Sequence, residues 1–506
     1  MISNQARKHF LKTKRLAKSL DHNEIYKWLL TEGYYPENYV LPPVFFVSKI
    51  PSRKRYYSYE TKKYSVPPKE LIEVHFPKSD LADRTFGIIE PTIHNDIAYE
   101  ISENWDQIIN ILFDPHNRVY SYSFPISLDA KNIGETGKLR SGRMIYEFLE
   151  MAECDLIAEA YKYKYLVKTD IKNFYPSIYT HSIPWALHGK AIIRKPENRK
   201  NYDFFGNRLD KLFQKSNDEC TNGIAIGPAI SDLIAEIILA AVDFQLSHKL
   251  LEDDGYLLVR FKDDYRVLCK DEGSAQKAIK IIQEELKDYK LTLNEEKTEI
   301  TNLPEGLFRP WKSEYLKINP KKGKLNFSQF QEFYLNVLNI DKTYPNTGVI
   351  DRFLADLRDK KYNLYIPSSM KDIDRSISLL LLLADRRIKA FPSILAIIEE
   401  IFKENSNEDI KKIIEEHLNA LLDKFAQNPE NNRYLITWIV YFLKSNKLQI
   451  NHIYTFSDPI EKAVYNNRKD TLFQNPDFAI FRSISKSKKA ISMIEHIDIF
   501  KRDKNF

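Results

Sequence analysis

Hydrophobic and polar residues follow different patterns in three successive zones of the chain. Residues 1–160 mix helical and extended patterns, with proline-rich joints at 42–43 and 67–68, and residues 161–300 alternate strand and helix signals. Beyond about residue 350, apolar or amphipathic runs are separated by polar turns, at 379–383, 394–401, 410–422 and 434–443. These runs predict stacked helical hairpins, although no fixed repeat length is present.

The central zone contains strand and helix signals in a definite order. A β-prone run, Tyr165–Asp170, precedes turn residues and a helix that begins near Ser182. A glycine loop at 223–227 leads into a helix with one buried face. Two β-rich runs flank Lys262-Asp263-Asp264 and predict a hairpin, and an amphipathic helix and an extended segment at 291–300 follow. The predicted order, β-α-β-β-α-β, is the ferredoxin-like split βαβ arrangement.

Three aspartates are predicted to meet in this arrangement. Asp170 ends the first strand, and Asp263 and Asp264 lie at the hairpin tip, 93 residues further along the chain. The first strand and the hairpin are neighbours in such a sheet, so the carboxylates converge. Each pair at ~4 Å costs on the order of 4 kcal/mol at an effective dielectric of about 20, so the cluster needs a cation. Oxygen ligands suit Mg²⁺, and two such ions would activate an attacking hydroxyl and stabilise a leaving pyrophosphate.

The same residues also allow a purely structural interpretation. Adjacent acidic pairs are common at this composition, with about 10 expected by chance. The pair Asp263-Asp264 is therefore informative only together with its hairpin, the strand-end Asp170 and the glycine-loop helix. The pattern alone leaves two alternatives open, a metal-dependent phosphoryl-transfer site and a structural βαββαβ module.

Composition narrows the class of protein. With 43% hydrophobic and 29% charged residues, the chain is typical of a soluble globular protein. No apolar run approaches the roughly 20 residues of a membrane helix, and no N-terminal segment resembles a secretion signal. Three cysteines exclude a disulfide scaffold and a cysteine-rich zinc module, and they fit a reducing cytosol.

Positive charge is concentrated in two N-terminal segments, although the net charge is only +6. Residues 1–20 contain six lysines and arginines and no acidic residue, and residues 53–64 mix cations with tyrosines. Cations that follow phosphates and rings that stack on bases suit single-stranded nucleic acid. A solvated helix face and a surface loop explain the two segments equally well.

At this point the central zone resembles a known family. Asp170-Ile-Lys-Asn-Phe-Tyr175-Pro-Ser looks like motif A of reverse transcriptases, and Phe261-Lys-Asp-Asp264 looks like their motif C. Gly223–Gly227 resembles motif B, and residues 291–300 resemble motif D. The stretch from Tyr179 to Lys190 is similar to the bacterial abortive-infection (Abi) reverse transcriptases, and it is AbiK-like, closest to the shorter prophage-encoded member.

The resemblance implies a role for individual residues. Asp170, Asp263 and Asp264 would be catalytic, and the metal ions would be held by Asp170, Asp263 and the Ile171 carbonyl. Tyr175 would lie under the incoming sugar and exclude a 2′-hydroxyl, and packing is its alternative role. Lys297 would face the triphosphate, unless it is an ordinary exposed lysine at a strand end. The expected substrate-binding residues are Phe174, Tyr175, Gly227, Lys297, Lys138, Arg140 and Arg143. The last three belong to a basic stretch that a simple surface loop would also explain.

The resemblance also implies a fold and an activity. The fold class is α+β, with reverse-transcriptase-like fingers in residues 1–160, a ferredoxin-like βαββαβ palm in 161–345 and an all-α, HEAT-like helical-repeat domain in 346–506. The activity is a Mg²⁺- or Mn²⁺-dependent DNA polymerase that uses deoxynucleoside triphosphates in the bacterial cytoplasm. It would act as a homo-oligomer in anti-phage defence, away from any membrane.

Template independence and protein priming are further implications. Ala225 and Ile226 replace the Pro-Gln of a templated motif B, and Ile226 cannot form the hydrogen bonds of a glutamine. Single-stranded DNA would be attached covalently through a tyrosine. The candidates lie in flexible-looking, basic or proline-flanked stretches, and most of them are expected to be packing residues: Tyr34, Tyr35, Tyr39, Tyr56, Tyr57 and Tyr59. The alternatives are an RNA-templated reverse transcriptase with a partner RNA and an inactive nucleic-acid-binding scaffold. His181 and His188 are expected to be structural.

Overall fold

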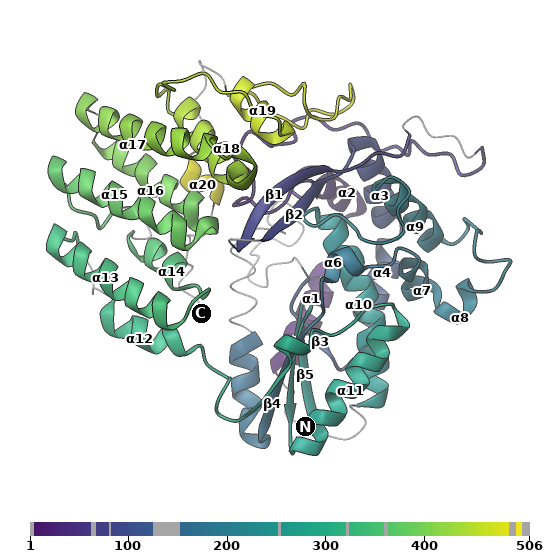
Figure 1. The fold of residues 1–506 in the computed structure, drawn as a ribbon. Coiled ribbons are helices and arrows are strands. Elements are labelled where there is room, and N and C mark those ends of the chain that lie inside the picture. The colour runs from purple at the N-terminus through teal and green to yellow at the C-terminus, as the bar shows by residue number, and fades with distance from the viewer. Residues whose placement is uncertain are drawn as a thin grey trace.

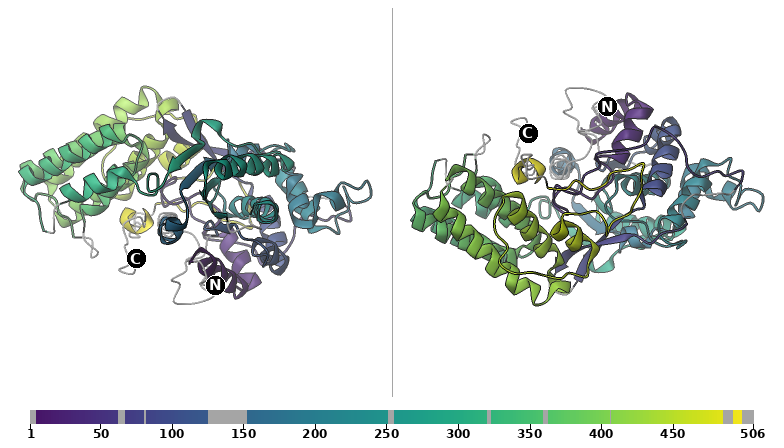
Figure 2. Two further views of the ribbon diagram at one scale, coloured as in Figure 1. Left: turned by 90° about the horizontal axis from the view of Figure 1, so that it is seen from below. Right: turned by 90° about the horizontal axis from the view of Figure 1, so that it is seen from above.

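The computed structural model describes residues 5–61, 67–79, 82–124, 152–250, 255–319, 323–358, 363–405, 407–484 and 492–497. Helices from the C-terminal third gather on one side of the molecule, and the sheets and the remaining helices form the other side (Figure 1). Both views in Figure 2 show the same division. None of the described helices is long and apolar enough to cross a membrane.

The N-terminal region combines four helices with a two-stranded hairpin. Its helices are α1 (Gln5–Lys18), α2 (His22–Leu30), α3 (Pro91–Glu103) and α4 (Trp105–Leu112). Asp21 caps α2 through its carboxylate, and Glu90 does the same for α3, in which Pro91 takes the first helical position. Strands β1 (Ile72–Ser79) and β2 (Ala82–Ile88) pair antiparallel, and β1 contacts α18 (Pro429–Ser445) of the C-terminal region. The hairpin therefore links the two sides of the molecule.

A five-stranded sheet forms the centre of the other side. Its order is β3-β5-β6-β4-β7, and its strands are β3 (Tyr120–Ser121), β4 (Tyr165–Asp170), β5 (Tyr256–Phe261), β6 (Asp264–Cys269) and β7 (Glu299–Asn302). Apart from the parallel β3–β5 pair, neighbouring strands are antiparallel. The predicted β-α-β-β-α-β order is confirmed, with β4 between β6 and β7.

Two local predictions about this sheet need correction. The hairpin link is Lys262-Asp263, because Asp264 already pairs with Phe261 as the first residue of β6. The segment 291–300 is extended only in part: Leu293 forms an isolated bridge with Ile171, and a 3₁₀ turn at Glu295–Lys297 precedes β7. Turn-forming Asn294 and the charged residues after it explain why the extended pattern breaks.

Two long helices, α10 (Ala229–Lys249) and α11 (Glu272–Asp288), pack together, and α11 lies against β4 and β6. The predicted apolar face of α11 is buried through Ala275, Ala278, Ile282 and Leu286. Four shorter helices lie between β4 and α10: α6 (Phe174–Ser177), α7 (Ser182–His188), α8 (Lys190–Ile193) and α9 (Phe205–Lys215). Helix α7 contacts both α9 and α10, so these helices extend the sheet-bearing side.

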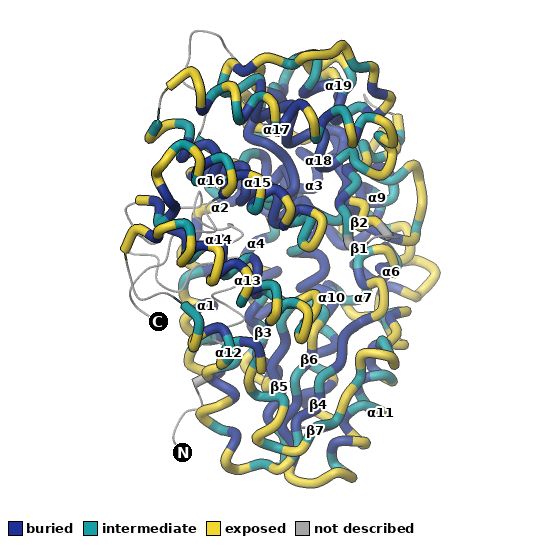
Figure 3. Tube along the Cα trace, turned by 60° about the vertical axis from the view of Figure 1, so that its left-hand side comes forward, coloured by how far each residue is buried: buried dark blue, intermediate teal, exposed yellow. Residues whose placement is uncertain are grey.

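The C-terminal region is helical, as predicted. Its helices are α12 (Pro310–Ile318), α13 (Phe327–Thr343), α14 (Val349–Asp356), α15 (Met370–Arg386), α16 (Phe391–Glu404), α17 (Glu408–Ala426), α18 (Pro429–Ser445), α19 (Pro459–Asn466) and α20 (Met493–Ile497). Successive helices pack on each other, and their buried positions face inwards while exposed ones follow the outer turns (Figure 3). Helices α12 and α13 contact α14, although the boundary expected at 345 places them with the palm. The three-domain division and the HEAT-like repeat stay predictions.

Candidate active site

The sheet brings the three predicted aspartates together. In the antiparallel β4–β6 pair Asp170 stands directly opposite Asp264, and residues opposed in this way have Cα atoms about 5 Å apart. The backbone N–H of Ile171 donates to the carbonyl of Asp263 at 3.2 Å. Residues far apart in sequence therefore meet at one end of the sheet. We call β5, β6 and their Lys262-Asp263 link the carboxylate hairpin.

The tip of the carboxylate hairpin is held from both sides. Lys262 has a positive φ of 51°, which closes the two-residue link. Its N–H donates to the hydroxyl of Ser123, and its carbonyl accepts a hydrogen bond of 2.9 Å from Nη1 of Arg260. These two contacts fix the backbone immediately before Asp263.

Arg260 belongs to a buried ionic network beneath the tip. The side chains of Arg260, Glu236 and Asp243 are 1%, 8% and 1% exposed. The guanidinium donates to Glu236 at 2.8 and 3.2 Å and to Asp243 at 2.7 and 2.9 Å, while the Tyr265 hydroxyl donates to Asp243 at 3.1 Å. Burial raises the pKa of Asp243 to about 6, even though Arg260 favours its charged form. The network joins α10 to the carboxylate hairpin.

The converging carboxylates perturb one another. Burial raises the pKa of Asp263, and the charge of Asp170 adds to the rise. Desolvation together with the charges of Asp263 and Asp170 raises the pKa of Asp264 to about 6, against the opposing effect of Arg266 and Lys297. The charged forms of Asp263 and Asp264 are therefore disfavoured where they stand, and a bound cation would relieve this.

The hydrogen bonds of Asp170 give the clearest indication of a metal site. Its Oδ2 accepts a hydrogen bond from Nζ of Lys297 at 2.5 Å, while its buried Oδ1 has no hydrogen-bond partner among the described residues. The hydrogen bond to Asp170 raises the pKa of Lys297. Carboxylate oxygens and an orphaned acceptor fit a hard divalent cation. Within the described residues, however, no three acidic, histidine or cysteine side chains form a complete ligand set.

Tyr175 lies beside the carboxylates and is held by α10. Its hydroxyl donates to Asp232 in the first turn of that helix at 2.5 Å, and Nζ of Lys262 is 3.8 Å from the same carboxylate. Burial and the Asp232 charge raise the pKa of Tyr175 well above its usual range. The neighbouring Phe174 is buried, with its ring centroid 5.2 Å from that of Tyr175. Tyr175 is therefore fixed in place, whereas Phe174 is a core residue.

The glycine loop joins this site to the β1–β2 hairpin. Gly223 donates its N–H to the Ile178 carbonyl, and Ile226 accepts a hydrogen bond of 2.9 Å from the N–H of Gly87 in β2. Gly227 has a φ of +121°, and a Cβ there would lie 2.8 Å from Pro36 and 3.1 Å from Phe86. Only glycine permits this close approach between the loop and the hairpin.

Comparison with known families now identifies the central zone. Residues 131–328 match the family model described as reverse transcriptase (RNA-dependent DNA polymerase). The chain carries a reverse transcriptase-type polymerase domain. Such a domain is a nucleotidyltransferase of the polymerase kind, and polymerases of this type generally use divalent metals. No curated protein matches the chain.

Among solved structures, the chain is similar to telomerases from Candida tropicalis. An apo telomerase truncated of its C-terminal domain is 16% identical, with a TM-score of 0.30, and the similarity covers 48% of this chain and 52% of that one. The apo telomerase is 14% identical with a TM-score of 0.34, covering 86% and 70% of the two chains. A telomerase in complex with the TWJ fragment of telomeric RNA is 16% identical with a TM-score of 0.30, covering 79% and 65%. The chain spans about half of the first of these, and TM-scores this low carry no inference.

The structure does not test the basic residues expected to grip a triphosphate, and it offers one further candidate. Lys138, Arg140 and Arg143 lie outside the described residues. Arg84 in β2 is exposed, and its positive charge favours the ionised form of Asp263. The alternating strand pattern around Phe86 could have indicated the hairpin, but nothing local in the sequence points Arg84 towards residues 170–264.

The predicted priming tyrosines are mostly packed into the protein. Tyr34, Tyr35 and Tyr57 are buried, and the hydroxyl groups of Tyr34 and Tyr35 donate to the carbonyls of Ile89 and Ile480. Tyr56 donates to Asp477 at 2.5 Å. These contacts favour packing roles at these positions.

The remaining predicted features have structural partners. Arg53, Lys54 and Arg55 pair with Glu103, Asp477 and Glu100, so these three cations are neutralised within the protein, while Lys62 and Lys63 lie outside the described residues. His181 lies 2.5 Å from Asp210, and Nε2 of His188 accepts from the N–H of Gly206 at 3.0 Å. Burial lowers the pKa of His188 to about 4. Both histidines are part of the packing around α7 and α9.

Proposed function

We propose that this protein is a metal-dependent DNA polymerase of the abortive-infection reverse transcriptase type, AbiK-like. The observation that carries the proposal is the β4–β6 register, which sets Asp170 opposite Asp264 and beside Asp263. Carboxylates assembled at this electrostatic cost are suited to phosphoryl transfer.

Each residue has a role in this proposal. Asp170, Asp263 and the Ile171 carbonyl hold Mg²⁺ or Mn²⁺, which when bound stabilises the charge of the transferring phosphate. Asp264 supports the cluster. Lys297 leaves Asp170 to contact the triphosphate of a deoxynucleotide, with Lys138, Arg140, Arg143 and Arg84 as further cationic contacts. Tyr175 lies under the sugar, held by its hydrogen bond to Asp232.

Synthesis without a template and from a protein primer is part of the same proposal. It is supported by Ile226, whose side chain offers no hydrogen bond to a template base and whose carbonyl is already bonded to Gly87. The product is single-stranded DNA bonded to a tyrosine of the enzyme. We place the protein in the bacterial cytoplasm, as a homo-oligomer that acts in defence against phage.

Nucleotide incorporation by an Asp263→Asn variant tests the chemistry. The variant keeps the size of the side chain but loses the charge, so we expect it to melt like the wild type and to incorporate no labelled deoxynucleotide. Asp385→Asn is the matched control, because Asp385 is an exposed helix residue remote from the three aspartates in sequence. Full incorporation by Asp263→Asn would refute the assignment.

The nature of the product separates this proposal from its alternatives. Random-sequence DNA supports protein priming if protease digestion leaves it bonded to a tyrosine peptide and nuclease digestion leaves a nucleotide on that tyrosine. DNA that copies an added RNA would indicate an RNA-templated reverse transcriptase, which the description of the matching family favours. If Mg²⁺ and deoxynucleotides neither raise the melting temperature nor support incorporation, the protein is a scaffold, since a ligand that binds only the folded state must stabilise it.

A further inference from the structure

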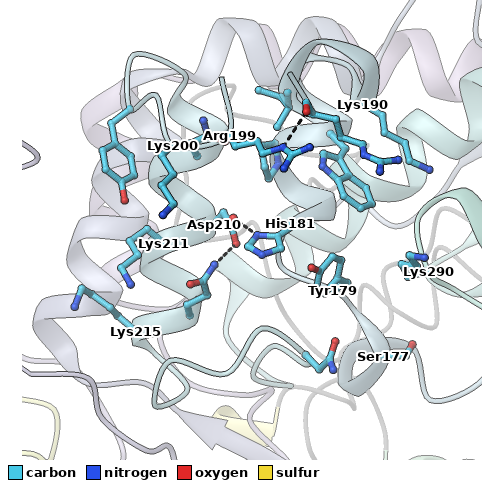
Figure 4. A pocket seen from close by; sticks show the side chains of 18 of the residues that line it. Ser177, Tyr179, His181, Lys190, Arg199, Lys200, Asp210, Lys211, Lys215 and Lys290 are labelled. Carbon is cyan, nitrogen blue, oxygen red and sulfur yellow. Dashed lines mark hydrogen bonds and ion pairs between the residues drawn. The ribbon is translucent and has the colours of Figure 1, made fainter. Parts of the chain in front are cut away.

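A large cavity lies beside α7, α8 and α9, and none of the three aspartates lines it. Its volume is about 1150 Å³, and Figure 4 shows basic side chains around its rim. Lys200, Lys211 and Lys215 come from one side, and Lys190 and Lys290 from the other. Small-molecule pockets usually measure ~300–1,000 Å³ and are largely apolar, so the size and charge of this cavity suit an extended anionic ligand.

The cavity carries uncompensated positive charge. Among the described residues, seven lysines and arginines line it, against a single lining carboxylate, Asp210, which is already bonded to His181 and to Gln214. Lys190, Lys211 and Lys215 pair with Asp288 and Glu219, which do not line the cavity. The other four, Arg194, Arg199, Lys200 and Lys290, are exposed, and no described carboxylate pairs with them. A cluster of free cations of this kind is a site for phosphates.

Aromatic rings lie between the cations. Tyr57, Tyr179, Trp185 and Tyr202 all line the cavity. Trp185 is half-buried, with Nζ of Lys190 5.2 Å from its ring centroid and the ring of Tyr179 5.8 Å away. Rings that line a cavity among cations suit a single strand, since unpaired bases stack on such rings while the phosphates contact the cations. A folded double helix would keep its bases from such rings.

The cavity wall is continuous with two parts of the polymerase domain. Tyr179 forms a β-bridge with Asn222, and the N–H of Thr180 donates to the Thr221 carbonyl at 2.9 Å. These segments follow Asp170 and immediately precede Gly223. A polynucleotide bound in the cavity therefore contacts two hydrogen-bonded segments that continue along the chain into the proposed nucleotide site.

We propose that this basic and aromatic cavity binds a single-stranded polynucleotide, with its phosphates on Arg194, Lys200 and Lys290 and a base on Trp185. The site is separate from the three aspartates, and binding there requires neither metal nor catalysis. DNA and RNA share the chemistry that the cavity recognises, and the experiment distinguishes them.

Fluorescence anisotropy without divalent metal or deoxynucleotides measures this binding. The probes are a short labelled oligothymidine and the matching oligouridine. The test variant is Arg194→Gln/Lys200→Gln/Lys290→Gln, and Lys324→Gln/Lys412→Gln/Lys447→Gln removes the same charge from exposed positions outside the cavity. We expect the test variant to bind at least one probe roughly tenfold to hundredfold more weakly than the wild type. When the logarithm of the binding constant is plotted against the logarithm of the salt concentration, the magnitude of the slope should be smaller by about 2. Equal affinity of the two variants, or no binding of either probe by the wild type, would overturn the proposal.

Intrinsic fluorescence tests the stacking separately. The other four tryptophans, Trp28, Trp105, Trp311 and Trp438, are buried, so quenching by a bound base reports on Trp185. We expect Trp185→Phe to abolish the quenching but keep the affinity, and Trp185→Leu to weaken binding. Quenching that persists in Trp185→Phe contradicts the proposal, and so does a thymidine mononucleotide that binds as tightly as the oligonucleotide. Failure of nucleotide incorporation would not affect either measurement, so the two proposals can fail independently.

Discussion

Replacing Arg260 by methionine tests how the carboxylate hairpin is held. Arg260 is buried and is the cation between Glu236 and Asp243. Methionine fills much of the same space but leaves both carboxylates buried without a positive partner. It also removes the hydrogen bond to the Lys262 carbonyl beside Asp263.

The expected loss of stability is large. Removing one partner of a buried ion pair costs about 3–5 kcal/mol, because the remaining charge is left uncompensated. Two carboxylates remain here, so we expect the upper part of that range near pH 8. For a domain of about 150–250 residues, each 1 kcal/mol corresponds to about 2–4 °C, so such a loss lowers the melting temperature by about 10 °C or more.

The loss should depend on pH with a definite sign. Asp243 already has a pKa raised to about 6, compared with about 3.9 in an unfolded chain, and the missing Arg260 raises it further. A carboxyl group with a raised pKa binds more protons in the folded state, so the stability it contributes is lost as the pH rises through that value. The deficit of Arg260→Met is therefore greatest near pH 8 and shrinks towards pH 5.5.

Urea and thermal unfolding at several pH values measure this effect. Arg375→Met is the control, because Arg375 is 47% exposed and its nearest carboxylate, Asp372, is 3.6 Å away. Exposed pairs of this kind contribute at most about 1 kcal/mol, so the control should unfold like the wild type. An Arg260→Met variant that is as stable as wild type at pH 8, or a deficit that grows on acidification, would refute the reasoning.

Three further predictions concern the site itself. The Mn²⁺ concentration needed to raise the melting temperature should increase as the pH falls below about 6, because Asp264 then binds a proton in the metal-free site, and an unchanged concentration between pH 8 and 5 would contradict this. Lys297 and a metal ion compete for Asp170, so Lys297→Met should let Mn²⁺ raise the melting temperature at about fivefold lower concentration, while incorporation decreases. An unchanged Mn²⁺ titration would argue against this competition. Gly227→Ala should cost about 1–3 kcal/mol in urea unfolding, whereas Gly348→Ala, with a φ of −90° and no atom nearer than 3.7 Å to the added Cβ, should change stability by less than about 1 kcal/mol.

The meeting of Asp170 with Asp263 and Asp264 was predictable because it follows from topology. Strand β4 and the hairpin have clear β-rich patterns, and the βαββαβ order leaves them no choice but to be neighbours. The register was not predictable to the residue. Whether Asp264 belongs to the turn or to the strand is decided by the positive φ of Lys262, for which the sequence contains no glycine signal.

The ionic network under the hairpin escaped sequence analysis for a different reason. Glu236 and Asp243 lie seven residues apart on α10, so they share one face of the helix, but charged residues there normally indicate a solvent-exposed face. Arg260 stands in an otherwise apolar strand. Only the packing of α10 against that strand shows that the three charges neutralise one another.

The same reasoning explains why the cavity beside α7 was missed. Four of its seven cations, Lys190, Arg194, Arg199 and Lys200, lie within eleven residues of sequence, but only the fold brings them beside Lys211, Lys215 and Lys290. The basic segment at 53–64 is paired where the structure describes it, since Arg53, Lys54 and Arg55 have acidic partners in the fold. Clustering along the sequence therefore does not by itself indicate free positive charge.

The site combines a fully paired ionic network below the carboxylate hairpin with an unsatisfied carboxylate oxygen above it. Below the hairpin tip, every charge of the network has a partner: Arg260 bonds to Glu236 and Asp243, and it also holds the backbone at Lys262. Above it, Lys297 occupies one oxygen of Asp170 and leaves the other unsatisfied. Because the support is fully paired, a cation that enters above it needs to displace only one exposed lysine side chain. The buried network thus allows the carboxylates to exchange partners without a rearrangement of the sheet.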